Sequence, residues 1–271
     1  MAIDFSASYV ERSRKNLPWE LKLQIKLAPW IKRVRLLRLK AGSKRVHPNA
    51  VVPRITEELE KSAVHFQKER WAFVENIFTP DFYKEFLARW PTKRYLEPPR
   101  AVEKSYNTGF RWVYGDKPDF AYSDPYGQYL TLRVLLEYLR SAEVAHRVTA
   151  FAGADKEMAL YSFILTDAGS GAEVIPHKDS INDDSRAEYN LNCIFFIDAS
   201  EGRDSGGLTL SRDNELKDRL FEPTKLKNTC LIYDILGDFY HGFPPIAKGK
   251  WRWVVTAQFC QRNYVTHQKE H

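Results

Sequence analysis

Residues 171–180, GAEVIPHKDS, place a histidine and an aspartate two positions apart at the end of a short apolar run. In a β-strand, residues i and i+2 point to the same side, so His177 and Asp179 could reach one metal ion if this stretch is extended. The pair is a weak signal by itself, because a chain with seven histidines produces such a pattern by chance. Its meaning depends on the sequence around it.

From Met158 onward, short apolar runs alternate with glycine, proline, asparagine and aspartate. Seven or eight such runs with turn residues between them are typical of an antiparallel sandwich or jelly roll. We therefore expect a β core over about 158–262. The runs are ALYSFIL (159–165), EVIPH (173–177), YNLNCIFFID (189–198), GGLTLS (206–211), NTCLIYDI (228–235), YHGFPPI (240–246) and WRWVVTAQFC (251–260).

The part of the chain before this core predicts helices and one strand. WAFVENIF (71–78) is typical of a strand. Thr79-Pro80-Asp81 predicts a helix start, with a capping hydroxyl, a proline in the first turn and an acid at the positive helix end; the helix should stop near Pro91. Two more helices are expected, at about 127–140 and at 142–152. Residues 93–125 hold many aromatics, glycines and prolines without a clear period, so we expect long loops there.

The net charge of +6 comes from the N-terminal part of the chain. Residues 11–45 carry twelve lysines and arginines against two glutamates, whereas the rest of the chain is net −4. Residues 17–45 interleave these cations with apolar residues, strand-like before Pro29 and like a basic amphipathic helix after it. We treat residues 1–50 as a basic N-terminal extension and seek any electrostatic partner there.

Three roles for the basic extension stay open: a solvated segment or a helix covering the core, peripheral contact of residues 17–45 with an anionic membrane surface, and nucleic-acid binding. Nucleic acid is disfavoured, because the sequence holds no recognised nucleic-acid-binding module. No apolar run approaches the ~20 residues of a membrane-spanning helix, and the N-terminus lacks a signal-like apolar stretch. We expect a cytoplasmic protein, with contact at the inner membrane surface as an option.

The three cysteines, Cys193, Cys230 and Cys260, are an odd number without paired spacing, and two of them lie in apolar runs. We expect small core residues in a reducing compartment, not a disulfide or a zinc site.

A second histidine, His241, follows Asp179 by 62 residues, with about four expected strands between them. That is enough chain for a jelly roll to bring His241 beside the first pair. Two imidazoles and one carboxylate on one face of an iron leave the opposite face open, which is the arrangement of non-haem Fe(II) oxygenases. Electrons for O2 can come from a bidentate 2-oxo acid, whose distal carboxylate needs a fixed cation. Arg252 suits this role because a guanidinium binds carboxylates bidentately and stays charged; Lys250 is the alternative.

At this point the sequence resembles a known family. Residues 158–260 look like the catalytic core of the 2-oxoglutarate- and Fe(II)-dependent oxygenases, in the branch with prolyl-hydroxylase-like and phytanoyl-hydroxylase-like enzymes. In prolyl-hydroxylase-like enzymes the basic residue lies ten positions after the second histidine, and this chain has Trp251 there. In phytanoyl-hydroxylase-like enzymes it lies eleven positions after that histidine, which matches Arg252. The matching features are Gly171, Pro176, Arg186, the Gly206-Gly207 turn, FEPTKLKNTCLIYDI (221–235), the Pro-Ile and glycine after His241, and WAFVENIFTPDFYKEFLARW (71–90).

The resemblance implies a mainly β protein with flanking helices (α+β). Its oxygenase domain would span 51–271, with a double-stranded β-helix (jelly roll, cupin-like) core and N-terminal helices packed on it. It implies that His177, Asp179 and His241 bind Fe(II), that Arg252 binds the far carboxylate of 2-oxoglutarate, and that Tyr161 or Asn192 hydrogen-bonds this co-substrate.

The activity implied is hydroxylation of an unactivated C–H bond with O2, releasing succinate and CO2. Related halogenases have a small residue in place of the carboxylate ligand, so Asp179 favours hydroxylation over halogenation. The alternative is a non-catalytic jelly-roll protein that binds metal for structure or sensing. The substrate could be a small molecule or a lipid- or sugar-linked one, with loops 93–125 and 180–188 framing the pocket mouth. The oligomeric state is left open.

Overall fold

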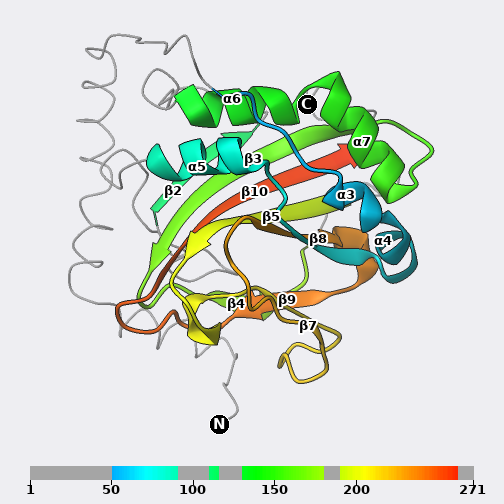
Figure 1. The fold of residues 1–271 in the computed structure, drawn as a ribbon. Coiled ribbons are helices and arrows are strands. Elements are labelled where there is room, and N and C mark those ends of the chain that lie inside the picture. Colours follow the sequence, from blue (N-terminus) through cyan, green and yellow to red (C-terminus); the bar gives the residue numbers. More distant parts are fainter. Residues whose placement is uncertain (1–50, 91–109, 116–129, 180–189, 262–271) are drawn as a thin grey trace.

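Two antiparallel sheets packed face to face form the protein, as Figure 1 shows for this computed structural model, which describes residues 51–90, 110–115, 130–179 and 190–261. The larger sheet has the strand order β1-β8-β5-β10-β3-β2, and the smaller has the order β4-β9-β6-β7. Helices α5, α6 and α7 cover the face of the larger sheet that points away from the smaller one (Figure 1). The expected mainly β fold with flanking helices and a double-stranded β-helix core is thereby confirmed.

The elements are as follows. The strands are β1 (Trp71–Glu75), β2 (Phe110–Gly115), β3 (Met158–Gly169), β4 (Val174–His177), β5 (Asn190–Ala199), β6 (Thr209–Ser211), β7 (Arg219–Phe221), β8 (Thr229–Asp234), β9 (Tyr240–Phe243) and β10 (Trp251–Gln261). The α-helices are α3 (Glu58–Lys61), α4 (Ala63–Glu69), α5 (Pro80–Ala88), α6 (Leu130–Leu139) and α7 (Ala142–Ala152), and short 3-10 turns are η4 (Arg203–Ser205) and η5 (Ile235–Gly237).

Side chains along the central strands of the larger sheet point alternately to its two faces, and each face contributes to a separate hydrophobic core. Phe195 of β5 belongs to the core under the helices, where its ring stacks on Phe78 with centroids 5.3 Å apart. The next residue, Phe196, belongs to the core between the two sheets. Residues of β8 and β10 divide in the same way, so any polar side chain on the inner face of these strands lies between the sheets.

The expected helices and strands are largely present, with shifted ends. The strand expected at 71–78 stops at Glu75, and the helix after it spans Pro80–Ala88 with Pro80 in its first turn; Thr79 precedes it but makes no side-chain cap. Helix α7 has the bounds expected, with Ser141 accepting a hydrogen bond from the amide of Val144 at 3.3 Å.

One expectation was wrong. Residues 110–115 lie in the segment for which loops were expected, yet they form β2, paired antiparallel with β3 from Phe110 opposite Asp167 to Gly115 opposite Ser162. The aromatic residues Phe110, Trp112 and Tyr114 alternate along this stretch, which is a strand-like pattern, but the glycines and prolines of the surrounding segment led to the prediction of loops. Strand β7 and helices α3 and α4 were also not foreseen.

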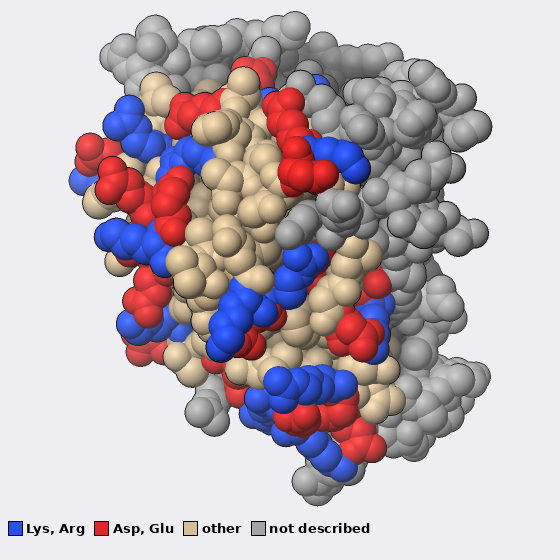
Figure 2. Space-filling view, turned by 90° about the vertical axis from the view of Figure 1, so that its right-hand side faces the viewer, with Lys and Arg blue, Asp and Glu red and all other residues tan. Residues whose placement is uncertain are grey.

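Charges of both signs are interspersed on the face shown in Figure 2. Ion pairs of the described residues include Lys225 with Glu75 and Arg219 with Glu222. The basic extension, including the strand and helix expected between residues 17 and 45, lies outside the described residues. Within the described part of the chain, no helix is long and apolar enough to cross a membrane. All three cysteines are buried, as expected for core residues.

Candidate metal centre

His177 and His241 are brought together by the pairing of β4 with β9. The two residues are directly opposite each other in the antiparallel register, whereas Val174 pairs with Phe243, so β4 has one more residue than β9 between these two pairs. Pro176 lies in this irregular stretch, which suits a residue without an N–H to give to the ladder. A bulge of this kind re-aims the side chains that follow it, and here it turns His177 toward His241, with ring centroids 4.4 Å apart.

Asp179 lies two residues beyond the end of β4 and completes a cluster of three candidate ligands. One oxygen, Oδ1, lies 3.4 Å from Nε2 of His177, and the other, Oδ2, lies 3.7 Å from Nε2 of His241. One ligand atom from each of the three residues lies within 4.8 Å of the others, which would allow all three to bind one ion. Imidazole nitrogens and a carboxylate on one side of an ion form the donor set that suits iron with open positions.

The ring orientation of His177 is fixed by a backbone group. Its Nδ1 lies 2.7 Å from the carbonyl oxygen of Ile175. A carbonyl only accepts hydrogen bonds, so Nδ1 carries the proton and Nε2 presents a lone pair toward Asp179 and His241. Metal-binding histidines are held by such a bond on their other nitrogen.

Asp179 is also held from the larger sheet. Asn192 of β5 donates from Nδ2 to Oδ2 of Asp179 at 3.3 Å, and the Tyr233 hydroxyl of β8 donates to the same oxygen at 3.2 Å. Burial by itself would raise the pKa of Asp179, but the neighbouring side chains of His177 and His241 and the hydrogen bond from the Tyr233 hydroxyl outweigh it. The pKa of Asp179 therefore lies well below its ordinary value, and the group is a carboxylate.

Arg252 is a buried cation between the two sheets. Its side chain extends from β10, opposite Ala168 and Ala199 on the neighbouring strands, and the residue is 6 % exposed. The guanidinium carbon lies 3.8 Å from the ring centroid of Phe243, and Nη1 donates to the carbonyl of Gly206. Burial lowers the pKa of Arg252 to about 9.

Within the described part of the chain, the Arg252 guanidinium has no carboxylate partner, and its buried Nε has no hydrogen-bond acceptor. A desolvated charge without a counter-ion is costly to bury. Phe243, which the guanidinium covers, is two residues after His241 on β9 and therefore points to the same side, roughly 7 Å along the strand. Among the described residues, the structure thus places a cation without a carboxylate partner over Phe243, the next side chain after His241 on that side of β9.

The other predicted site residues have different surroundings. Lys250 lies just before β10, where it pairs with Asp204 at 2.8 Å and donates to the Glu201 carbonyl, so its charge is already neutralised. Tyr161 lies on β3 at a shift in the register with β10, because Gln258 pairs with Ser162 and Phe259 with Leu160. Asn192 lies against Asp179 and Tyr233. Contact of Tyr161 or Asn192 with a co-substrate stays a prediction.

Sequence reasoning missed Tyr233, Phe243 and the carbonyl of Gly206 as parts of the site. Alternation along β8 could have indicated that Tyr233 faces the smaller sheet together with Leu231. The spacing from His241 could likewise have placed Phe243 on the ligand side of its strand.

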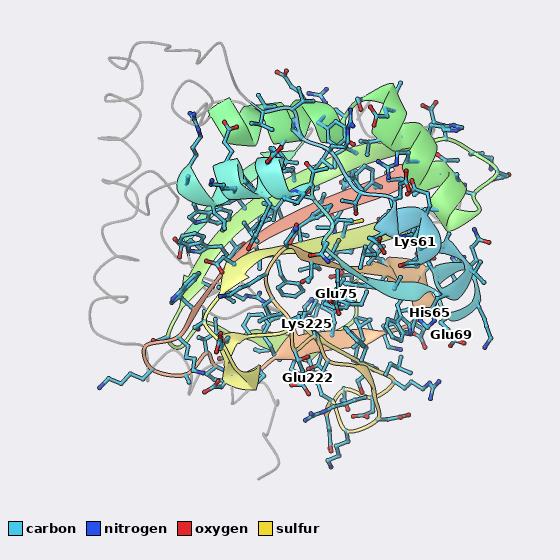
Figure 3. All side chains as sticks on the ribbon, viewed as in Figure 1. Lys61, His65, Glu69, Glu75, Glu222 and Lys225 are labelled. Atoms are coloured by element: carbon cyan, nitrogen blue, oxygen red, sulfur yellow. The ribbon has the colours of Figure 1, made fainter. Side chains whose placement is uncertain are left out.

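A cavity of about 470 Å³ lies elsewhere in the molecule. Glu75 and Lys225, labelled in Figure 3, contribute to its wall and form an ion pair at 2.8 Å. None of the three candidate metal ligands, nor Arg252, lines this cavity. We assign it no part in the metal centre.

No protein-family model and no curated protein sequence matches this chain. Solved structures do resemble it. A prolyl-4-hydroxylase from Pseudomonas putida has 15% identity and a TM-score of 0.51, with 75% of this chain and 99% of that chain covered. A prolyl hydroxylase from Trichoplax adhaerens, solved with a peptide fragment of the oxygen degradation domain of hypoxia inducible factor, has 12% identity and a TM-score of 0.52 over 77% and 91%.

A third structure, an oxidoreductase of the 2OG-Fe(II) oxygenase family from Burkholderia pseudomallei, has 10% identity and a TM-score of 0.51 over 78% of this chain and 94% of that chain. These likenesses show that the chain has the fold of the 2-oxoglutarate- and Fe(II)-dependent oxygenases.

Proposed function

We propose that this protein is a 2-oxoglutarate- and Fe(II)-dependent dioxygenase that hydroxylates an unactivated C–H bond. Three facts support the proposal: the fold is that of these oxygenases, two histidines and an aspartate converge at one point, and a buried arginine lies near them. Without the arginine, the fold and the ligand cluster would indicate only a jelly roll that binds a metal.

The three candidate ligands fit an iron ion. His177 presents Nε2 because its Nδ1 proton is engaged by the Ile175 carbonyl, and Asp179 is ionised. Both groups are therefore in the state that metal binding requires. A bound iron would supply binding and activation of O2, with 2-oxoglutarate as the electron donor.

Arg252 is the single observation that carries the proposal beyond metal binding. A metal ion that only stabilises the fold does not require a buried arginine beside it, and Arg252 has no carboxylate partner among the described residues. A dicarboxylate that binds the metal at one end would bring its other carboxylate to this guanidinium and satisfy the orphaned Nε. Phe243 beneath the guanidinium keeps its plane in place and excludes water from one face.

The chain's own residues would therefore bind and orient the reactants. The pair of sheets excludes water from Arg252, which strengthens its attraction for an anion. Asp179 retains its charge and occupies a metal position, which favours hydroxylation over exchange of that position for a halide. Beyond the three candidate ligands, Arg252 is the titratable side chain that these roles require.

The test is anaerobic addition of Fe(II) and 2-oxoglutarate to the full-length protein, followed by admission of air. We expect a weak visible charge-transfer band in the anaerobic sample and formation of succinate under air. His177→Ala and His241→Ala should abolish both signals while leaving the fold intact. A protein that binds iron but gives neither band nor succinate would be the non-catalytic metal-binding or sensing alternative, and global unfolding of the histidine variants would favour a structural metal.

The substrate is best identified by measuring how candidate compounds change the rate at which the protein converts 2-oxoglutarate to succinate. Two of the similar structures are prolyl hydroxylases, one of them with a peptide bound. A screen should therefore include proline-containing peptides beside free amino acids, lipids and lipid- or sugar-linked compounds. A true substrate raises succinate formation above the uncoupled rate and is recovered with one added oxygen atom.

A further inference from the structure

Asn192 and Tyr233 form a hydrogen-bonded pair that ends on Asp179. The two residues are direct partners across β5 and β8. Asn192 donates from Nδ2 to the Tyr233 oxygen at 2.7 Å and to Oδ2 of Asp179 at 3.3 Å. Tyr233 donates to the same Oδ2 at 3.2 Å. Both side chains are buried between the sheets, and Tyr233 is 1 % exposed.

The direction of these hydrogen bonds is fixed by what each group can donate. A carboxylate only accepts, so Asp179 must receive from both neighbours. The amide of Asn192 must therefore turn Nδ2 toward Asp179, because the opposite orientation would set its oxygen against the carboxylate. Tyr233 receives a hydrogen from this amide, which leaves its own single proton for Asp179.

The two oxygens of Asp179 consequently differ. Oδ2 accepts two hydrogen bonds, which use its two in-plane lone-pair directions. Oδ1 accepts none from these residues and lies 3.4 Å from Nε2 of His177. We propose that Tyr233 and Asn192 are positioning residues that hold Asp179 so that Oδ1 alone binds the metal, an inference that rests on the metal site proposed above.

Binding through one oxygen has a consequence for the site. A carboxylate that turned and used both oxygens would occupy a second position on the ion, which the proposed reaction needs for 2-oxoglutarate or O2. Tyr233 also packs against the His241 ring, with centroids 5.0 Å apart. A single buried side chain thus contacts two of the three candidate ligands, while the backbone of Ile175 fixes the third.

The decisive variant is Tyr233→Phe, which keeps the ring and removes only the hydroxyl. Outer partners of metal ligands change metal affinity by about 10–100-fold when they are removed. We expect Tyr233→Phe to weaken Co(II) binding by about 10-fold or more and to alter the visible Co(II) spectrum, which reports the ligand arrangement. Asn192→Ala removes the other donor and should change both readouts in the same direction.

Tyr138→Phe is the matched control, because Tyr138 also has a hydroxyl that accepts from one group, the amide of Ile55 at 3.2 Å, and donates to another, Glu143 at 3.3 Å. It lies on α6, on the helix side of the larger sheet (Figure 1). It should leave Co(II) affinity and spectrum unchanged, even if it lowers thermal stability.

The experiment uses the full-length, metal-free protein titrated with Co(II) alone. If the wild-type protein binds no Co(II), the proposed function itself fails. If the wild type binds Co(II) and both Tyr233→Phe and Asn192→Ala bind it with the same affinity and spectrum, the positioning role is wrong and the proposed function stands. If Tyr233→Phe does not fold, Asn192→Ala decides alone.

Discussion

His177 on β4 and His241 on β9 are direct partners across the smaller sheet, with ring centroids 4.4 Å apart. This pairing exists because β4 and β9 approach closely beside the histidines. A Cβ atom on Gly242 would lie 2.7 Å from the carbonyl oxygen of Val174 and 2.9 Å from the nitrogen of Pro176. The glycine after His241 is therefore what lets the two strands meet at the candidate metal centre.

Gly242→Ala should separate β9 from β4 and move His241 away from His177. Crowding of this kind lowers the free energy of unfolding by about 1–3 kcal/mol, since the contacts are backbone atoms that cannot turn aside. We also expect Co(II) affinity to fall by about 10-fold or more, as for other changes that misplace a ligand. Denaturant unfolding and Co(II) titration measure the two effects.

Gly249→Ala is the control for this substitution. Gly249 has a φ of 79°, and a Cβ atom added there would have no atom within 4 Å. Alanine at this position would therefore strain the backbone without crowding any neighbouring atom. It should lower stability by about 1 kcal/mol and leave Co(II) affinity unchanged. Equal Co(II) affinity in both variants would show that the strand approach at Gly242 does not position His241.

Arg252→Met tests the buried cation. Because the guanidinium is desolvated and lacks a carboxylate partner among the described residues, replacing it with an apolar side chain of similar length should not lower the free energy of unfolding of the protein alone. Affinity for 2-oxoglutarate should fall by about 2–5 kcal/mol, the usual loss when one partner of a buried charge pair is removed. Calorimetric titration of the metal-loaded protein and thermal unfolding with and without 2-oxoglutarate are the measurements.

Lys250→Met is the matched control, since it removes a cation two residues away that already pairs with Asp204. It should bind 2-oxoglutarate as the wild type does. Loss of binding in Lys250→Met, with binding retained in Arg252→Met, would assign the anchor to Lys250 instead.

Local pattern in the sequence was enough to predict the β core and part of the cluster of candidate metal ligands. Apolar runs bounded by turn residues gave seven of the strands with ends within a few residues, and the His-x-Asp spacing correctly grouped His177 with Asp179. The reason given for the grouping was only partly right, because β4 ends at His177 and Asp179 lies beyond it. A bulge at Pro176 and contacts across the sheets bring these residues together, not strand periodicity alone.

The parts that could not be predicted depend on register between distant strands. Asn192 meets Tyr233 because β5 and β8 pair in one register among several that the apolar pattern allows. For the same reason, nothing in the sequence reveals that Arg252 covers Phe243 or donates a hydrogen bond to the Gly206 carbonyl. The strand β2 was missed although its aromatic residues alternate, because the segment around it is rich in glycine and proline and its partner β3 lies about 50 residues further along the chain.

Hydrogen bonds of a single arginine attach the segment before β1 to α7. Arg147 of α7 donates to Glu60 of α3 at 2.6 Å and to the carbonyl oxygens of Ile55 and Thr56, each at 2.8 Å. Arg147→Met leaves these carbonyls without their donor and should lower stability by about 1–3 kcal/mol, and the part of this loss that comes from the carbonyls does not depend on pH.

Glu60→Gln should have a smaller and pH-dependent effect. The hydrogen bond from Arg147, partly opposed by burial, lowers the pKa of Glu60 below the model-peptide value of 4.5. The unfolded chain therefore binds more protons in the acid range, so the ion pair stabilises the fold above pH 4.5 and this contribution is lost as the pH falls through the lower, folded-state pKa. Because Glu60 is 45% exposed, the difference between wild type and Glu60→Gln at neutral pH should stay below about 1 kcal/mol.

Denaturant unfolding of wild type, Glu60→Gln and Glu58→Gln between pH 7 and pH 3 measures this dependence. Glu58 is the matched control, since it lies on the same helix and pairs with the exposed Lys61. The difference between wild type and Glu60→Gln should shrink as the pH falls, while Glu58→Gln should differ little from wild type throughout. A Glu60→Gln difference that stays constant down to pH 3 would mean that the charge of Glu60 does not contribute, and that the Arg147 hydrogen bonds to the Ile55 and Thr56 carbonyls alone attach this segment.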